Sequence, residues 1–293
     1  MRPLSALAGI AALAAPLVAP LAASAQALPP TLELTYTTYA GGFTTLSLIT
    51  DFSLSPGGYR VSLSYRTVGA VGFFLPGHDA VSAEGAWDGG TVRPAEFESE
   101  GAWNGNSYDV VMDYPDGSPE VQRLEPSQTS IREPVPASLR QDTIDTGSAM
   151  ALLLHRMVDG GRCDLSARVF DGRRLMVLAS REAGTETLAP TVRSFFHGPA
   201  IRCDVTGKLL AGFLRADDLA RRNRVRQGAV WFARPIPGLP LLPVRIEFDN
   251  RWFGAATMYL TNVTAGPRTL PAPQTDLALG PQPAVPPPAG ARH

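Results

Sequence analysis

The sequence predicts one large, mainly β domain in which an antiparallel sheet is covered by a helix. Apolar and polar residues alternate in several runs, and turn sequences separate those runs. Glycine and proline number 28 and 27 of 293 residues, and so many chain breakers exclude a long helical bundle or coiled coil. A hydrophobic content of 44% is ample for a globular core.

The N-terminus predicts a secretory signal peptide over residues 1–25. Arg2 precedes an apolar stretch over residues 4–21, and Ala23-Ser24-Ala25 provides the small-x-small pattern of a cleavage site. A retained membrane anchor is the alternative, but two prolines interrupt the stretch. No later segment is long and apolar enough to span a membrane, so we expect no transmembrane segment in the mature chain. Lys208 is the only lysine in a composition rich in Ala, Arg, Gly and Pro, which favours a GC-rich bacterium and hence a periplasmic protein.

The C-terminal residues 266–293 are dominated by proline and alanine. Such a segment buries too little apolar surface to offset the entropy of ordering, so we expect a disordered, partly polyproline-II tail. A docking ligand for a partner is the alternative. Residues 26–265 remain as a single β domain.

The predicted strands alternate clearly at residues 32–36, 59–65 and 244–248. Turn sequences stand at residues 55–58, 88–90 and 115–117. Asp171-Gly172 lies between two further strand-like segments and predicts a tight hairpin with a two-residue loop.

A helix is expected over residues 144–158. Asp142 or Asp145 could cap its start, and Gly160-Gly161 ends it. Apolar residues recur at helical spacing at Met150, Leu153, Leu154, Met157 and Val158. The pattern leaves open whether this helix seals a packed core or forms the lid of a cavity.

A second helical candidate covers residues 216–225, where acidic residues precede basic ones as the helix dipole favours. It contains a basic run formed by Arg221, Arg222, Arg224 and Arg226. A solvated loop or hairpin tip is the plain interpretation, and a patch that contacts anionic lipid headgroups is the alternative.

The two cysteines, Cys163 and Cys203, predict a disulfide in an oxidising compartment. Both lie in strand-like segments, so we expect a cross-strand bond. A redox or zinc pair is disfavoured because the sequence has no C-x-x-C and too few thiols.

Sequence patterns for catalysis, metals and nucleic acids are missing. We find no G-x-S-x-G, no P-loop and no clustered histidines, so we expect no catalytic residue, cofactor or metal site. The formal net charge of -1 argues against a nucleic-acid partner.

An apolar loop over residues 71–77 raises the possibility of a ligand site. An exposed apolar loop either folds over the core or marks a binding surface. A concave sheet with an apolar mouth would hold a lipid or acyl chain. The candidate contacts are Val71, Phe73, Phe74 and Leu75 from the loop and Leu153, Leu154 and Met157 from the helix.

From Cys163 onward the sequence contains a series of motifs, in order Val169-Phe170-Asp171-Gly172-Arg173-Arg174, His197–Cys203, Gly212-Phe213, Val230-Trp231-Phe232 and Leu242-Pro243-Val244-Arg245-Ile246. This order of motifs resembles the DUF3108 family of bacterial exported proteins. The resemblance implies a large curved antiparallel sheet or unclosed β-barrel, reminiscent of the periplasmic lipoprotein-carrier fold, which holds acyl chains under covering helices. It implies no catalytic residues.

Three functions follow as hypotheses. The first is a non-enzymatic periplasmic protein that binds an apolar ligand, a lipid or a lipidated envelope component. The second is an envelope scaffold without a small ligand, which would use the tail or the basic run. The third is a hydrolase, which would need a Ser, His or carboxylate to converge in a pocket.

Overall fold

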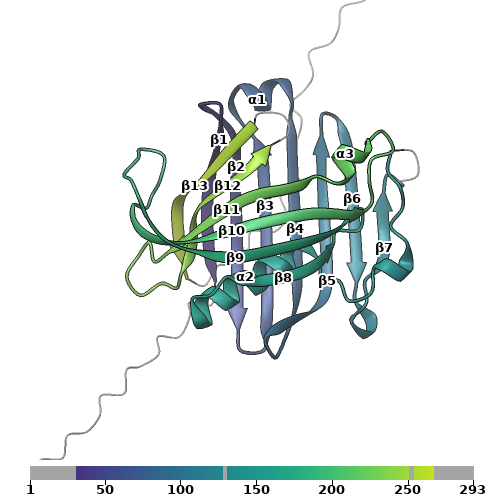
Figure 1. Cartoon of the computed structure of the whole chain (residues 1–293), viewed down its shortest axis with the longest axis horizontal. Coiled ribbons are helices and arrows are strands. Elements are labelled where there is room, and N and C mark those ends of the chain that lie inside the picture. Colours follow the sequence, from purple (N-terminus) through teal and green to yellow (C-terminus); the bar gives the residue numbers. More distant parts are fainter. Residues whose placement is uncertain (1–30, 128–130, 251–253, 267–293) are drawn as a thin grey trace, which may run out of the picture.

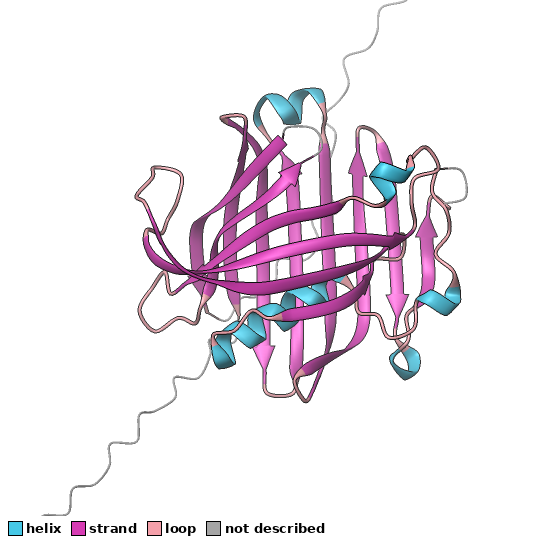
Figure 2. Cartoon of the chain, in the orientation of Figure 1, coloured by secondary structure: helices cyan, strands magenta, loops and turns pink. Residues whose placement is uncertain are grey.

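The structure is a computed structural model that describes residues 31–127, 131–250 and 254–266. These residues form a thirteen-stranded antiparallel sheet in the order β7-β6-β5-β4-β3-β2-β1-β13-β12-β11-β10-β9-β8 (Figures 1 and 2). The strands are β1 (Leu32–Ala40), β2 (Phe43–Ser55), β3 (Gly58–Thr67), β4 (Gly77–Asp88), β5 (Thr91–Trp103), β6 (Asn106–Asp113), β7 (Glu120–Glu125), β8 (Leu165–Phe170), β9 (Leu175–Leu188), β10 (Gly198–Ala211), β11 (Val225–Ala233), β12 (Leu242–Asn250) and β13 (Gly254–Ala265). The helices are α1 (Gly69–Phe74), α2 (Thr146–Gly160) and α3 (Leu219–Arg222), with short 3-10 turns η1 (Pro115–Gly117) and η3 (Ala137–Leu139). The predicted signal peptide and tail lie outside the described residues.

The sheet is bent into two layers that face each other. Strands β1–β7 form one layer as a simple meander, and β9–β13 run across its face as the other (Figure 1). β1 joins the layers because it pairs with both β2 and β13. Phe97 and Met112 from one layer share a core cluster with Phe170 and Leu175 from the other, so the far ends of the sheet meet without pairing. The prediction of a mainly β, unclosed antiparallel sheet is therefore confirmed.

The β8–β9 hairpin closes the gap between the two ends of the sheet. Arg173, at its tip, donates hydrogen bonds to the backbone carbonyls of Glu125, Pro126 and Asp109 on the opposite edge. Nearby, Arg132 donates to the carbonyl of Gly212 at 2.9 Å. These hydrogen bonds from arginine side chains to backbone carbonyls hold the two layers together where their strands do not pair.

The hairpin differs from its predicted form. Phe170 pairs with Leu175, so the loop contains four residues rather than the two that Asp171-Gly172 suggested. The Asp171 carboxylate accepts hydrogen bonds from the backbone N–H groups of Arg173, at 2.9 Å, and Arg174, at 2.6 Å. This local capping extends the turn by two residues.

Helix α2 lies between the layers at one end of the sheet (Figure 2). Its N-cap is Asp145, whose carboxylate accepts from the Ser148 N–H at 2.7 Å, and Gly161 ends it in the left-handed conformation. The predicted helix is confirmed, displaced by two residues. Its buried side chains, including Leu152 and Leu154, belong to the main core cluster.

Two other segments differ from expectation. The apolar stretch predicted as a loop contains the short helix α1, and its two phenylalanines project from it. The second predicted helix shrinks to one turn, α3, which begins after the capping residue Asp218.

Candidate functional site

A polar cluster lies on the inner face of the β1–β7 layer, among apolar neighbours. Tyr65 on β3 pairs with Asp79 on β4, Asp79 pairs with Gly101 on β5, and Gly101 pairs with Tyr108 on β6. Directly paired residues of antiparallel strands point to the same face. A Cβ at Gly101 would lie 2.6 Å from the Tyr108 hydroxyl, so this glycine leaves the room that Tyr108 needs to reach toward Asp79.

Asp79 is the centre of this cluster. Ser99 donates a hydrogen bond to its carboxylate at 3.3 Å, and the Tyr108 hydroxyl interacts with both Asp79 and Tyr65. Burial raises the pKa of Asp79 to about 6, because hydrogen bonds from Ser99 and Tyr108 only partly offset the loss of solvent. The pKa values of both tyrosines are raised, also mainly by burial. Perturbed groups of this kind concentrate at functional sites.

Arg174 reaches this cluster from the opposite layer. Its charge lowers the pKa of Asp79 and of Tyr65, which places the guanidinium between the layers. Asp171 forms an ion pair with it at 2.7 Å and is the main reason that the pKa of Arg174 is raised. The Arg174 side chain nevertheless remains 47% exposed. Solvent therefore enters the space between the layers at this point.

An apolar wall adjoins Arg174. Met176 and Leu178 follow it at two-residue intervals on β9 and pair with Leu209 and Gly207 on β10. These positions share the face of buried Cys203, which is the inner face. Met176, Leu178 and Leu209 are half-buried and are not part of the core clusters of the described residues. We call Tyr65, Asp79, Tyr108 and Arg174, together with this wall, the inner site.

The structure separates the seven predicted apolar ligand contacts. Phe73 and Phe74 are 80% and 73% exposed on α1, with Val71 and Leu75 beside them half-buried. On α2, Leu154 and Met157 are buried in two core clusters, and Leu153 is half-buried against the second of them. Figure 1 places α1 and α2 at opposite ends of the sheet, so these residues do not form one site.

The four arginines of the basic run also have different environments in the structure. Arg222 forms an ion pair with Glu133 at 2.7 Å and lies over the Phe213 ring at 4.9 Å. Arg221, Arg224 and Arg226 are exposed. Arg222 therefore contributes to local structure rather than to a free basic patch.

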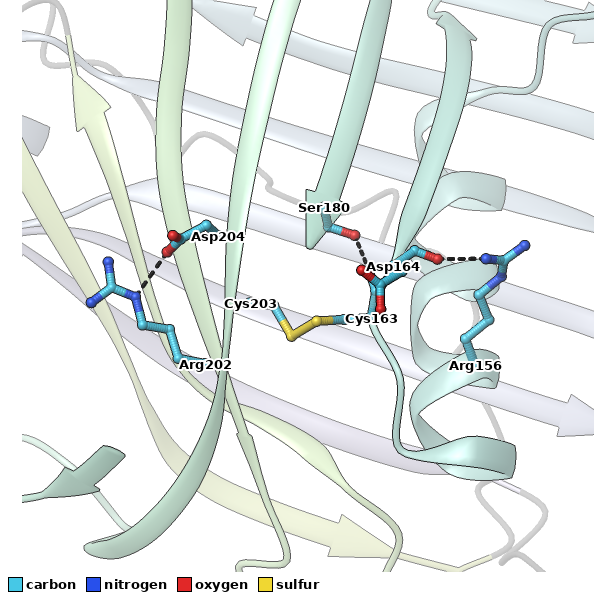
Figure 3. Close-up of a disulfide and its surroundings, with 7 residues drawn as sticks. All are labelled: Arg156, Cys163, Asp164, Ser180, Arg202, Cys203 and Asp204. Carbon is cyan, nitrogen blue, oxygen red and sulfur yellow. Dashed lines mark hydrogen bonds and ion pairs between the residues drawn. A yellow bond between two sulfur atoms is a disulfide. The ribbon is translucent and has the colours of Figure 1, made fainter. Parts of the chain in front are cut away.

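The predicted disulfide between Cys163 and Cys203 is present, with Cα atoms 6.2 Å apart (Figure 3). Cys203 lies in β10, but Cys163 lies just before β8, which corrects the expectation that both are in strands. Because β9 separates β8 from β10, the bond crosses over a strand and ties the end of α2 to the second layer. Arg156 supports this junction by donating to the Asp164 carbonyl at 2.5 Å, and Ser180 donates to the Cys163 carbonyl (Figure 3).

A buried acid–serine pair at the start of α2 resembles a catalytic arrangement only superficially. The Ser148 hydroxyl contacts Asp145 at 2.5 Å and Tyr59 at 2.6 Å. Asp145 and Ser148 are both fully buried, so a substrate has no access to them. Their role is to cap the helix and attach it to β3. Within the described residues, no group of three or more His, Cys, Asp or Glu side chains could hold a metal ion.

A shallow groove of about 1230 Å³ lies on the outer face of the β2–β7 region. Its lining includes Asp51, Ser62, Ser82 and the ion pair between Arg60 and Glu84, although apolar atoms contribute more of its surface than polar atoms do. These polar residues point to the far side of the sheet from the inner site.

Sequence reasoning missed all four polar members of the inner site. Asp79 and Tyr108 lie in strands whose buried face the linear pattern does not identify, and Arg174 was noted only in the motif Val169–Arg174 on which the family resemblance rests. The one available signal was a charged residue, Asp79, at the same two-residue spacing as Val81 and Ala83.

The sequence matches the DUF3108 family, described as proteins of unknown function, over residues 33–261. The chain therefore belongs to the DUF3108 family. Among solved structures, it is similar to a β-barrel-like DUF1849 protein from Brucella abortus, with 12% identity, a TM-score of 0.46, and 81% of this chain and 98% of that chain covered. It also aligns with a domain described as an outer membrane lipoprotein-sorting protein from Vibrio parahaemolyticus, with 7% identity, a TM-score of 0.28, and 80% and 85% covered. No curated protein matches the sequence.

Helices in the described part of the chain are too short or too polar to cross a membrane.

Proposed function

We propose that this chain is a non-enzymatic binding protein of the bacterial periplasm that holds an amphiphilic ligand in its inner site. The ligand has an acyl or similarly apolar part and an acidic group. The main observation behind this proposal is the environment of Arg174. Its side chain lies between the two layers, is still 47% exposed, and adjoins a half-buried apolar wall.

The chemistry of the site supports this ligand class. A guanidinium offers two parallel donors to a carboxylate or phosphate, and its partner Asp171 engages only the Nε and Nη2 side of Arg174 in the described contacts. Met176, Leu178 and Leu209 provide an adjoining surface on which an apolar chain gains free energy by leaving water. Met is well suited to such a surface because its side chain adapts to different shapes.

The proposed location outside the cytoplasm rests on two observations. The first 25 residues have the pattern of a signal peptide, and a disulfide of this kind is stable in an oxidising compartment. Cleavage before Gln26 would be checked by N-terminal sequencing of the protein from a periplasmic extract.

The binding proposal is tested with a dansyl-labelled undecanoate as the probe. Wild-type protein is expected to raise and blue-shift the dansyl fluorescence, and Arg174→Gln is expected to weaken binding about tenfold because the carboxylate loses its ionic partner. The matched control is Arg181→Gln, an exposed arginine on the outer face of the same strand, which should bind like the wild type. Equal affinity for all three proteins, or no binding by the wild type, would refute the proposal.

Asp79 supplies a second test of the same site. Its negative charge lies close to Arg174 and disfavours an anionic ligand, and protonation near its pKa of about 6 removes that charge. Probe affinity should therefore rise as the pH falls from about 7 to about 5, while the probe's carboxylate is still mostly ionised. Asp79→Asn should abolish most of this pH dependence.

A further inference from the structure

One end of the β1–β7 layer carries exposed phenylalanines on adjacent turns. Phe43 follows the β1–β2 turn, and Phe73 and Phe74 lie on α1, which connects β3 to β4. They are 69%, 80% and 73% exposed, more than any other phenylalanine in the described part of the chain. Helix α1 is held beside β2, since the Val68 N–H donates to the Thr45 carbonyl at 3.0 Å. We call Phe43, Phe73, Phe74 and the turns that carry them the aromatic tip.

The three turns of the β1–β7 layer at this end are free of charge. Residues 34–50, 67–77 and 101–108 form these turns and the strand segments that lead to them, and they contain no Asp, Glu, Lys, Arg or His. At the chain's average of 18% charged residues, these 36 residues would carry about six such side chains. By contrast, turns at the opposite end contain Asp88 and Asp116.

Amphipathic aromatic and basic residues follow behind the tip. Tyr39 and Tyr259 pack edge to face with ring centroids 6.0 Å apart, and Trp103 packs over Gly77. The Arg193 guanidinium lies over the Tyr39 ring at 4.5 Å. The order of phenylalanine at the extremity, then tyrosine and tryptophan, then arginine is the order that a bilayer interface favours, from acyl chains through the headgroup boundary to phosphate.

We propose that the aromatic tip inserts into the surface of a phospholipid bilayer and docks the protein there. A bilayer fits better than a protein partner because the phenylalanines project from convex turns instead of lining a groove. The three turns that carry these phenylalanines and their neighbours contain no charged side chain, so none of them has to move a charge out of water, which would oppose insertion strongly. This proposal is independent of the ligand proposed for the inner site, because it concerns a different set of residues on the outside of the fold.

Vesicle flotation tests the proposal with the full-length mature protein. We expect the wild type to float with phosphatidylcholine vesicles, and to float more completely when phosphatidylglycerol is included because of Arg193 behind the tip. Phe73→Ser combined with Phe74→Ser should lower the bound fraction at least tenfold. The control combines Ile131→Ser with Leu219→Ser, which are 63% and 77% exposed on other segments, and it should float like the wild type.

A second readout shows whether the tip itself enters the lipid. A Phe74→Trp variant should gain a blue shift of its emission on addition of vesicles, relative to the same addition to wild-type protein. A wild type that does not float, or a serine variant that floats normally, would overturn the proposal. The same conclusion would follow if the serine changes abolished only self-association, measured by sedimentation without vesicles. Unchanged circular dichroism of the variants would confirm that they fold.

Discussion

Replacement of Asp79 by asparagine is the most direct test of the environment between the layers. The carboxyl of Asp79 has an ordinary pKa of 3.8, and burial raises it to about 6 in the folded protein. Below about pH 3 the group is mostly neutral in both states and contributes little difference. Between about pH 4 and pH 6 the unfolded chain releases the proton while the folded protein still holds it.

Stability therefore falls as the pH rises through this window. A rise in pKa from 3.8 to about 6 corresponds to at most about 3 kcal/mol of lost stability at pH 7 relative to acidic conditions, and since Asp79 is only partly buried, solvent screening reduces this to about 1–2 kcal/mol. An asparagine side chain at this position would keep a similar shape without a charge to desolvate. Asp79→Asn should thus stabilise the protein at pH 7 by about 1–2 kcal/mol, or about 2–8 °C in Tm for a domain of this size, and have little effect near pH 3.5.

The assay is urea unfolding of wild type and Asp79→Asn at several pH values. Taking the difference between the two proteins removes the contribution of other carboxyls with raised pKa values, among them Asp51 and Asp145. Glu98→Gln, on the exposed outer face of β5, controls for the loss of one negative charge from the protein. A stability difference between wild type and Asp79→Asn that does not change between about pH 3.5 and pH 7 would refute the reasoning, because Asp79 would then titrate as it does in water.

Four further substitutions test the framework around the inner site. Cys163→Ser opens a 40-residue loop and should lower the free energy of unfolding by about 4 kcal/mol in oxidising buffer, and the wild type should fall to the same value when reduced. Arg173→Ala removes the donors that reach Glu125 and should cost about 1–3 kcal/mol, with faster amide hydrogen exchange in β6 and β7. Met157→Ala should cost about 2–5 kcal/mol in urea unfolding because its side chain is fully buried. Phe73→Ala should cost less than about 0.5 kcal/mol, and similar losses for these last two variants would contradict the described packing.

The sequence was informative wherever a local rule determined the structure. Alternation in residues 32–36 and 59–65 identified strands because one face of each is buried. Asp145 and Gly161 bounded α2 because the orphan N–H and C=O groups at helix ends need local partners. These features depend on neighbours within a few residues, which a linear pattern contains.

The inner site could not be predicted from local sequence patterns. Tyr65, Asp79 and Tyr108 become neighbours only through the register of four strands, and Arg174 approaches them from the other layer. The sequence interpretation also grouped Phe73 with Leu154 because both are apolar and near turns or helix faces. Nothing in a linear pattern indicates that one lies on an exposed tip and the other in the core at the opposite end.

The position of α2 answers the question that the sequence left open. The helix packs into the core at the end of the sheet where β2 turns into β3, so it fills that part of the interior instead of covering a hollow. The inner site lies toward the other end, since Tyr65 and Asp79 are within three residues of the strand ends next to α1. The accessible part of the interior and the aromatic tip therefore share one end of the molecule. If both proposals hold, docking through the tip would place Arg174 and its apolar wall near the bilayer surface, where an amphiphile could pass between membrane and protein with a short path through water.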